Sequence, residues 1–299
     1  MPRPWSEYSL REWLRITPFE QRYNYARYQL KARPVAARPA ERGDVGAVRA
    51  AVGSRDVLVT VAFNDAEFID WQASLLRRHA PSPLRVVIDN STDDVVARQI
   101  EQVAEARGSL YIKLRPPPWR RAIDGGRAHA SAMNWTWRNV LRPGRPRAFG
   151  FIDHDLFPMR ATDPFAPLAD YPVAGQVRDK SGCGRWFLWA GFCFFRFYAV
   201  ERVALDFSLD WAAGLDTGGA NWFRLYRHLA ASDVFDVGET LEPVADDLSI
   251  DVARFEWVGD WLHYSNFSTP YDMQPDERAA LGRRKRALLA AKLVPLLGV

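Results

Sequence analysis

The stretch VLVTVAFNDAEFIDWQASLLRRHAPSPLRVVIDN, residues 57–90, carries the clearest structural signal in the chain. Its first seven residues form a continuous apolar run rich in valine, which is typical of a strand buried on both faces. Residues 69–79 then place apolar side chains at helical spacing, and residues 84–89 form a second buried run. A strand, a helix and a strand in succession predict a parallel pair joined by a crossover helix.

The same alternation continues along the chain. Residues 93–108 are predicted to form a helix, residues 110–114 a third strand, residues 129–141 another helix and residues 148–153 a fourth strand. This pattern predicts an α/β fold, with a mainly parallel sheet flanked by helices. Ligands of such sheets bind where the carboxyl ends of the strands open into loops.

After residue 155 the pattern becomes irregular and aromatic. Residues 184–200 are expected to form a strand, residues 215–219 (LDTGG) a loop and residues 221–230 a helix. This mixture suits a smaller lobe that faces a substrate.

Composition sets the class of protein. Of the 299 residues, 48% are hydrophobic and 25% are charged, as in a globular protein with a large core. The net charge is +4. Residues 1–53 hold ten Lys and Arg against five Asp and Glu, a surplus of five, which leaves −1 for the rest. A general nucleic-acid-binding surface is therefore not indicated. The basic, aromatic N-terminal segment could hold an anionic partner or pack on the main domain as a helix.

We predict three regions. Residues 1–53 form an extension, with a helix over residues 8–32 and a linker over residues 31–44, which hold two prolines and a glycine. Residues 54–268 form the main domain. Residues 269–299 form a basic, helical C-terminal tail, expected to dock on the domain or, alternatively, to lie on an anionic membrane surface.

Two observations bear on location. The sequence shows neither the apolar core of a signal peptide nor a run long enough to span a bilayer. Cys183 and Cys193 lie in one apolar stretch without histidines at zinc-finger spacing, so neither a disulfide framework nor a structural zinc site is expected. A cytoplasmic protein, in contact at most with the inner surface of a membrane, fits best.

Asp153 and Asp155 end the fourth predicted strand. Two residues apart on an extended chain, their carboxylates project to one side, as joint contact with Mg²⁺ or Mn²⁺ requires. Such ions commonly bridge to substrate phosphates. The glycine patterns of dinucleotide-binding folds and P-loops are missing, as is the serine elbow of α/β hydrolases. A metal-assisted reaction of a diphosphate is therefore favoured.

Five segments in order resemble the family 2 glycosyltransferases. They are the opening strand and turn with VVIDNSTDD (86–94), then GGRAHASAMNW (125–135), FIDHDLFP (151–158), AGFCFFRFYAV (190–200) and GLDTGG (214–219). This resemblance implies a GT-A fold, in which a nucleotide-binding sheet is fused to an acceptor-binding lobe. It also implies metal-dependent, inverting transfer of a sugar from a nucleotide diphosphate, first of all a UDP-sugar, to an acceptor hydroxyl.

The resemblance assigns roles residue by residue. Asp216 would be the general base, and Mn²⁺ or Mg²⁺ would be held by Asp153, Asp155 and His263, a late histidine like that of several GT-A enzymes. The remaining assignments are nucleotide-sugar contacts for Asn64, Glu67, Asp89, Asn134 and Asp153, and acceptor contacts for Trp189, Gly191 and Phe192.

Alternatives remain open at this point. Leu215 stands where the family has glutamate, so Asp206 and Asp210 rival Asp216 as base. His129 could approach the donor diphosphate, and the Arg-rich turn over residues 115–127 could close over it. A nucleotidyltransferase, or a non-catalytic module that binds a polymer, would be the other functions. The acceptor could be a glycan, a metabolite, a protein or a modified nucleic acid.

Overall fold

The computed structural model describes residues 5–116, 125–180, 184–210, 213–265 and 273–297. The strands are β1 (Asp56–Ala62), β2 (Leu84–Asp89), β3 (Leu110–Lys113), β4 (Ala148–Asp153), β5 (Leu156–Pro158), β6 (Val173–Lys180), β7 (Arg185–Arg196), β8 (Val234–Asp236), β9 (Thr240–Pro243), β10 (Arg254–Val258) and β11 (Trp261–His263). The helices are α1 (Leu10–Leu14), α2 (Thr17–Ala37), α3 (Val45–Val52), α4 (Ala66–His79), α5 (Asp94–Ala106), α6 (Gly125–Thr136), α7 (Arg142–Gly144), α8 (Phe197–Val200) and α9 (Pro275–Leu297).

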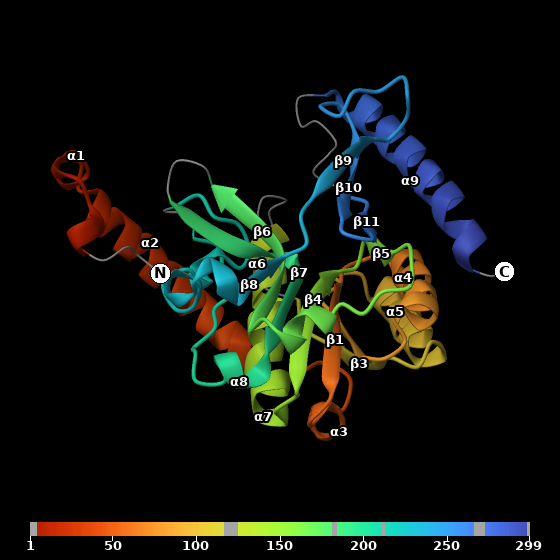
Figure 1. Cartoon of the computed structure of the whole chain (residues 1–299), viewed down its shortest axis with the longest axis horizontal. Coiled ribbons are helices and arrows are strands. Elements are labelled where there is room, and N and C mark those ends of the chain that lie inside the picture. The colour runs from red at the N-terminus through yellow and green to blue at the C-terminus, as the bar shows by residue number, and fades with distance from the viewer. Residues whose placement is uncertain (1–4, 117–124, 181–183, 211–212, 266–272, 298–299) are drawn as a thin grey trace.

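The larger sheet has seven strands in the order β3-β2-β1-β4-β7-β6-β8. Strands β1 to β4 pair in parallel, as predicted. Strand β7 then runs antiparallel to both β4 and β6, and β8 pairs in parallel with β6. The predicted fold class, a mainly parallel sheet flanked by helices, is confirmed (Figure 1).

Helices cover both faces of the parallel strands. On β1, Val57, Val59 and Val61 face one way and belong to the core that includes residues of α3 and α6. Ala62 belongs instead to a second cluster with residues of α4 and α5. This alternation follows from the two-residue period of a strand, and it explains why β1 carries an uninterrupted apolar run.

A smaller antiparallel sheet, in the order β5-β11-β10-β9, stands beside the end of β4. Strand β5 begins three residues after β4 ends, and its Leu156 pairs with His263 on β11. This pairing brings a segment more than 100 residues away in the sequence against the carboxyl edge of the large sheet. The histidine is thereby placed by backbone hydrogen bonds rather than by a flexible loop.

The prediction of a linker over residues 31–44 is wrong for the first half of this segment. Helix α2 continues to Ala37 with Pro34 inside it. Its end is held against α6 and the π-helical turn Trp137–Leu141 that follows α6. Trp135 Nε1 donates to the Arg38 carbonyl at 2.8 Å, and Asn139 Nδ2 donates to the Ala36 carbonyl at 3.0 Å. These tertiary contacts stabilise a helical end that proline and the local composition disfavour.

The helix predicted over residues 221–230 is also not observed. Two short 3₁₀ turns, Gly219–Asn221 and Tyr226–His228, take its place. Gly218 enters this segment with φ of +94°, and the Tyr226 ring is buried against Trp186, with ring centroids 5.0 Å apart. Packing of large aromatic side chains at this point overrides the helical spacing of the sequence.

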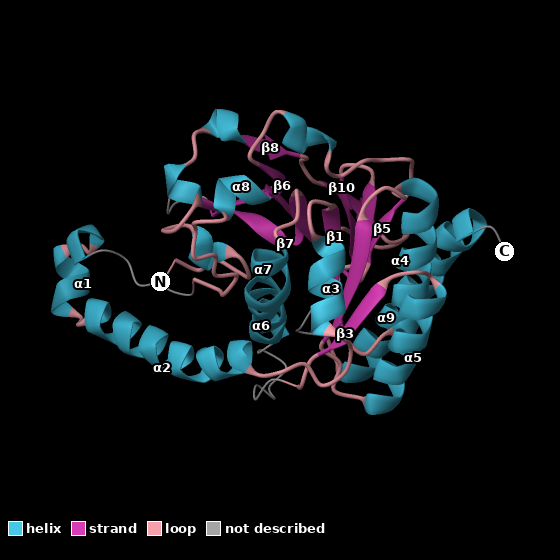
Figure 2. Ribbon diagram, turned by 90° about the horizontal axis from the view of Figure 1, so that it is seen from below, coloured by secondary structure: helices cyan, strands magenta, loops and turns pink. Residues whose placement is uncertain are grey.

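The C-terminal helix α9 lies beside α4 and the smaller sheet, at the opposite end of the molecule from α1 and α2 (Figures 1 and 2). Its side chains Leu281, Leu289 and Leu293 are buried in an apolar cluster with residues of both elements. The tail is thus docked on the domain, and these leucines are covered. Among the described residues, none of the helices has the length and hydropathy needed to cross a membrane.

Docking of α9 predicts a clear effect on stability. Leu289 is fully buried, so Leu289→Ala should lower the free energy of unfolding by about 2–5 kcal/mol. Val294, on the same helix, is half exposed, and Val294→Ala should change it by less than about 0.5 kcal/mol. Urea denaturation of both variants measures the difference. Equal stabilities of the two variants would contradict the docked arrangement.

Candidate functional site

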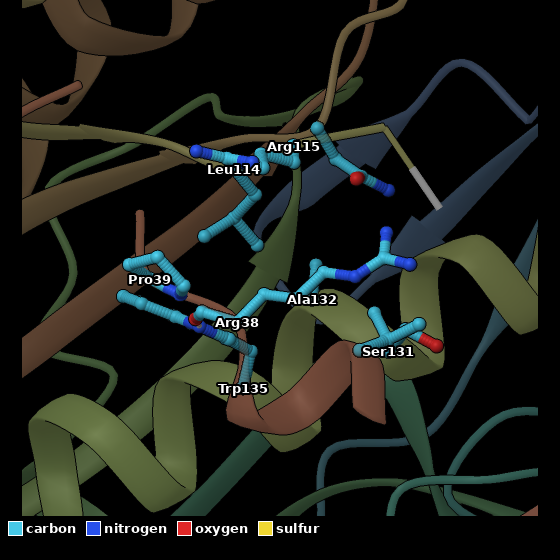
Figure 3. Close-up of a pocket in the computed structure, with 9 residues that line it drawn as sticks. Arg38, Pro39, Leu114, Arg115, Ser131, Ala132 and Trp135 are labelled. Atoms are coloured by element: carbon cyan, nitrogen blue, oxygen red, sulfur yellow. Dashed lines mark hydrogen bonds between the residues drawn. The ribbon is translucent and has the colours of Figure 1, made fainter. Parts of the chain in front are cut away.

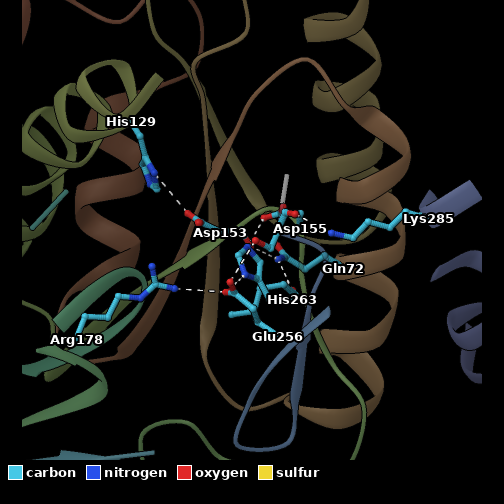
Figure 4. A network of polar contacts seen from close by, with 10 residues as sticks. Gln72, His129, Asp153, Asp155, Arg178, Glu256, His263 and Lys285 are labelled. Atoms are coloured by element: carbon cyan, nitrogen blue, oxygen red, sulfur yellow. Dashed lines mark hydrogen bonds and ion pairs between the residues drawn. The ribbon is translucent and has the colours of Figure 1, made fainter. Parts of the chain in front are cut away.

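Asp153 ends β4 at the carboxyl edge of the parallel strands, and Asp155 lies in the short connection between β4 and β5. Together with His263 on β11 they form a group whose potential ligand atoms lie within 4.8 Å of one another (Figure 4). Asp155 and His263 are buried, and Asp153 is partly exposed. Two carboxylates and one imidazole are a donor set suited to Mn²⁺, and carboxylates alone to Mg²⁺. The predicted metal ligands are therefore brought together.

Gln72 on α4 holds the backbone of this connection through hydrogen bonds of its side-chain amide. Its amide nitrogen donates to the carbonyls of Asp153 and Leu156, both at 2.7 Å, and its amide oxygen accepts from Thr60 Oγ1 at 2.7 Å. Gln72 is itself buried. This buried amide fixes the turn on which both aspartates stand.

His263 is held on both ring nitrogens. Nε2 lies 3.3 Å from Asp155 Oδ1, and Nδ1 lies 2.9 Å from Oε2 of Glu256 on β10. The indole of Trp189 packs against the ring, with centroids 4.6 Å apart. This is the arrangement of a histidine ligand oriented by a second carboxylate, which fixes which nitrogen faces the ion.

The charges of this cluster shift its pKa values. Burial by itself would lower the pKa of His263, but the carboxylates of Asp155 and Glu256 raise it to about 10. Burial by itself would raise the pKa of both carboxyl groups, but the imidazolium lowers that of Asp155 well below its usual range and that of Glu256 to about 2. In the metal-free protein, the protonated histidine is thus the counter-ion of its two carboxylate neighbours.

Glu256 has further partners that keep it ionised. Arg178 Nη2 lies 3.4 Å from Oε2, Arg254 Nε lies 3.7 Å from Oε1, and Ser265 Oγ donates to Oε1 at 3.3 Å. The Arg178 guanidinium also stacks over the Trp189 ring, 4.7 Å from its centroid. The oxygens of Glu256 are therefore occupied by groups that position it and His263, whereas the carboxylate of Asp153 is partly exposed.

His129 on α6 faces the same carboxylate from the other side. Its Nδ1 lies 3.4 Å from Asp153 Oδ1 (Figure 4). An imidazole at this place could donate to a phosphate oxygen bound beside Asp153. The hypothesis that His129 approaches a donor diphosphate agrees with this position.

Gly191 on β7 is packed directly against the cluster. Opposite Gln176, β7 has a register shift, and there Gly191 lies so close to its neighbours that a Cβ would stand 2.2 Å from Trp189 Cζ2 and 2.6 Å from Asp153 Oδ2. The predicted acceptor residue Phe192 is buried against Phe194 and Trp261, with centroids 4.7 and 5.3 Å away. Glycine here leaves room for the aspartate and the tryptophan.

Gly191→Ala should therefore damage the site without unfolding the protein. The new methyl group must displace Trp189 or Asp153, and a misplacement of about 1 Å can cost roughly 10²-fold in rate. A methyl group added to Gly282 on α9 would meet no atom within 4 Å, so Gly282→Ala serves as control and should retain full activity. Turnover and thermal melting of both variants test this. A fully active Gly191→Ala variant would refute the tight packing.

The three candidate bases differ in what surrounds them. Asp206 and Asp210 are buried and paired with arginines, Asp206 with Arg224 at 3.6 Å and Asp210 with Arg185 at 3.4 Å. Asp216 is exposed, and its Oδ1 accepts from the backbone N–H of the next residue at 2.7 Å. Of the three, Asp216 alone presents its carboxylate to solvent.

Asp216 and the cluster of Asp153, Asp155 and His263 both lie beside helix α6. Asp216 Oδ1 lies 3.4 Å from the position that a Cβ of Gly126 would occupy, and His129, three residues further, contacts Asp153. Residues three apart share a helix face. Asp216 and Asp153 thus lie next to two positions of α6 that share one face.

The residues predicted to contact the nucleotide form hydrogen bonds or ion pairs with other residues of the protein. Both carboxylate oxygens of the buried Asp89 accept hydrogen bonds, one from the Tyr111 hydroxyl and one from the Ser91 backbone, each at 2.7 Å. Asn64, with φ of +48°, ties its loop to the backbone of Thr92 at 3.0 Å. These side chains shape the loops at the edge of the sheet.

Glu67 and Asn134 also have partners within the protein, an ion pair for Glu67 and hydrogen bonds for Asn134. Arg286 of α9 contacts Glu67 at 2.5 Å and Asp65 at 2.7 Å. Asn134 accepts from the Phe207 backbone at 2.8 Å and donates to Asp206 at 3.2 Å. Direct contact of these residues with a nucleotide stays a prediction. Residues 117–124 of the Arg-rich turn, and Cys183, lie outside the described residues.

The sequence reasoning missed Gln72, Glu256 and Arg178. Gln72 lies within a regular amphipathic helix pattern and does not stand out from it. The role of Glu256 becomes apparent only from the pairing of β10 with β11, which places it opposite His263. No local signal in the sequence marks either residue.

Fold and site define an α/β protein whose parallel sheet presents an acidic, histidine-containing cluster at its carboxyl edge. No protein-family profile matches the sequence, and no characterised protein matches it significantly. Solved structures that it resembles include glycosyltransferases. One is a mannosyltransferase of Pyrobaculum calidifontis, in complex with GDP-Man and Mn²⁺ (15% identity, 62% of this chain and 54% of that chain, TM-score 0.36).

Two further structures have similar levels of likeness. One is the glucosyl-3-phosphoglycerate synthase of Mycobacterium tuberculosis (17% identity, 86% of this chain and 85% of that chain, TM-score 0.38), and the other is the galactosyltransferase LgtC (12%, 49% and 59%, TM-score 0.34). The chain thus spans only about half the length of the mannosyltransferase.

Proposed function

We propose that this protein is a metal-dependent glycosyltransferase of the GT-A type, which transfers a sugar from a nucleotide diphosphate to an acceptor hydroxyl with inversion. The observation that carries the proposal is the convergence of Asp153, Asp155 and His263 at the carboxyl edge of the parallel sheet. The order of family 2-like segments in the sequence supports it.

In this proposal Asp153, Asp155 and His263 would hold Mn²⁺ or Mg²⁺. When bound, such an ion neutralises the negative charge that develops on a leaving diphosphate. Glu256 orients the histidine, and Gln72 fixes the turn that bears the aspartates. His129 would add a hydrogen bond from the opposite side.

Asp216 would take the proton from the acceptor hydroxyl as that oxygen attacks the anomeric carbon. Its exposed carboxylate and its place along α6 support this role. Trp189 and Gly191, beside Asp153, would border the acceptor. The donor expected first is a UDP-sugar, and the acceptor is left open.

A thermal-shift screen tests the donor site. The full chain is heated with UDP, GDP, TDP or CMP, each with and without Mn²⁺ or Mg²⁺. A ligand that binds only the folded state at a hundred times its Kd stabilises by about 2.7 kcal/mol. We expect a metal-dependent increase in Tm with one diphosphate, UDP first. No shift with any nucleotide would refute the proposal and favour a non-catalytic binding module.

A further inference from the structure

The N-terminal extension carries most of the exposed apolar side chains of the molecule. Of the thirteen large hydrophobic residues that are exposed in the described part of the chain, eight lie within residues 5–30. They are Trp5, Leu10, Trp13, Leu14, Ile16, Phe19, Tyr23 and Leu30. Helix α1 and the start of α2 lie at the end of the molecule opposite α9 (Figures 1 and 2). Apolar side chains concentrated on one exposed surface are typical of a site that binds a protein or a membrane.

The apolar residues of α2 form a stripe along its outer face. At about 100° of rotation per residue, Phe19, Tyr23 and Leu30 lie within about 40° of one another around the helix. Their side chains are 57%, 67% and 74% exposed. The stripe therefore faces solvent along most of the length of α2.

The opposite face of α2 packs on the domain. Tyr28 lies about 180° around the helix from Phe19. Its hydroxyl lies 3.0 Å from Ser208 Oγ. At the end of the helix, Trp135 of α6 lies against Arg38 and donates through Nε1 to its carbonyl at 2.8 Å (Figure 3). Helix α2 is thus anchored through its inner face, and the outer stripe takes no part in this contact.

An aromatic cluster holds α1 against the start of α2. The Trp13 ring lies 5.4 Å from that of Trp5 and 6.0 Å from that of Phe19, centroid to centroid. Leu10 and Leu14, which are one turn apart on α1, are 77% and 79% exposed. The apolar surface of α2 therefore continues onto α1. We call the exposed side chains of both helices the N-terminal patch; it consists of Leu10, Trp13, Leu14, Phe19, Tyr23 and Leu30.

Basic residues border the stripe on both sides. In helical rotation, Arg27 and Lys31 follow one edge of the stripe, and both lie within about 80° of it. Arg22 and Arg33 follow the other edge at similar angles. Helix α2 contains one acid, Glu20. Among the described residues, Arg27, Lys31 and Arg33 form no ion pair. The patch thus combines an apolar centre with a positively charged border.

We propose that the N-terminal patch binds the surface of a lipid bilayer that contains anionic headgroups. The apolar side chains enter the boundary between headgroups and acyl chains, and the basic side chains contact the phosphates. Tryptophan and tyrosine are enriched at this boundary, where their amphipathic rings are favoured. The proposal concerns a surface remote from the metal-type cluster and does not rest on the glycosyltransferase activity.

Two other partners match the patch less well. If two copies of the chain paired through this face about a twofold axis, the basic border of one copy would lie near that of the other. Single-stranded nucleic acid could stack on the aromatic rings, but it offers no aliphatic surface to cover Leu10, Leu14 and Leu30. An anionic bilayer complements both the charge and the aliphatic side chains.

Sedimentation of the full chain with lipid vesicles tests the proposal. Vesicles of phosphatidylcholine alone are compared with vesicles of phosphatidylcholine and phosphatidylglycerol in equal parts, without metal or nucleotide. We expect binding to the anionic vesicles, weakened by added salt because exposed charges are screened. Leu14→Gln and Phe19→Gln should each weaken binding by about tenfold, because one inserted apolar side chain is lost. Arg27→Gln should weaken it by about fivefold.

Val95→Gln and Arg98→Gln on α5 are the matched controls. Val95 is 67% exposed and Arg98 is exposed, so these variants make the same kinds of change outside the patch and should bind like the parent. Arg283→Gln makes the charge change on the exposed side of the basic helix α9. Because all these side chains are exposed, every variant should keep the Tm of the parent protein.

Absence of binding to the anionic vesicles, or equal weakening by the α5 variants, would overturn the proposal. Weakening by Arg283→Gln but not by Arg27→Gln would also overturn it, because the contact would then belong to the C-terminal helix. A dimer in analytical ultracentrifugation that Leu14→Gln dissociates, without vesicle binding, would assign the patch to a second copy of the chain. The assay contains neither metal nor nucleotide, so failure of the glycosyltransferase proposal and failure of this one are told apart.

Discussion

Asp155→Asn is expected to lower kcat/KM for sugar transfer by at least about 10³-fold, or about 4 kcal/mol in the barrier. The substitution keeps the size of the side chain but removes the charge that faces His263 at 3.3 Å. Mn²⁺ binding, measured by calorimetry, should be lost together with activity. Because Asp155 is buried, Asp153→Asn, at the partly exposed ligand, provides a second test with less effect on folding.

Asp260→Asn is the control for both variants. Asp260 is exposed in the turn between β10 and β11, so this variant makes the same chemical change in the hairpin that carries His263. It should retain activity and Mn²⁺ binding. If folded Asp153→Asn and Asp155→Asn proteins work within tenfold of the parent, the aspartates are not metal ligands.

Asp216→Asn is expected to lower kcat by about 10²–10⁴-fold, the usual contribution of a general base. The amide oxygen can still accept from the Thr217 backbone, so the turn should remain intact. Because Asp216 is not among the candidate metal ligands Asp153, Asp155 and His263, the affinity for the metal and nucleotide should not change. Single-turnover kinetics and nucleotide titration separate the two quantities.

The rival bases give the matched comparison. Asp206→Asn and Asp210→Asn remove buried partners of Arg224 and Arg185, so they should lower stability more than Asp216→Asn does. If one of them abolishes turnover in a folded protein while Asp216→Asn is active, the base has been misassigned. NMR of the product anomer tests inversion in the same reaction, and a retained anomer would exclude this role of Asp216.

Local patterns were sufficient for the parallel half of the fold. Strands β1 to β4 are buried on both faces, so their apolar runs were readable, and Asp153 and Asp155 followed from where β4 ends. The end of α2 and the segment over residues 221–230 were mispredicted, because hydrogen bonds from α6 and aromatic packing outweigh local propensity there. Position in a family-like order indicated His263, whereas Glu256 needed the strand pairing.

The nucleotide contacts show another limit of sequence reasoning. Asp89 ends β2 as predicted, but Tyr111, one strand away on β3, donates its hydroxyl to the carboxylate. A tyrosine within an apolar strand gives no indication of the partner across the sheet. The type of residue and its place at the sheet edge were predictable, but its hydrogen-bonding state was not.

The pairing of β5 with β11 has a consequence for the thermodynamics of ion binding. Leu156 and His263 are partners in the ladder, and the Tyr264 backbone N–H donates to the Asp155 carbonyl at 2.9 Å. The ligands on either side of this pairing are therefore ordered when the chain folds. The loss of conformational entropy that comes with ordering these ligands therefore occurs on folding and does not oppose ion binding. Preorganisation of this kind favours tight, geometrically selective binding.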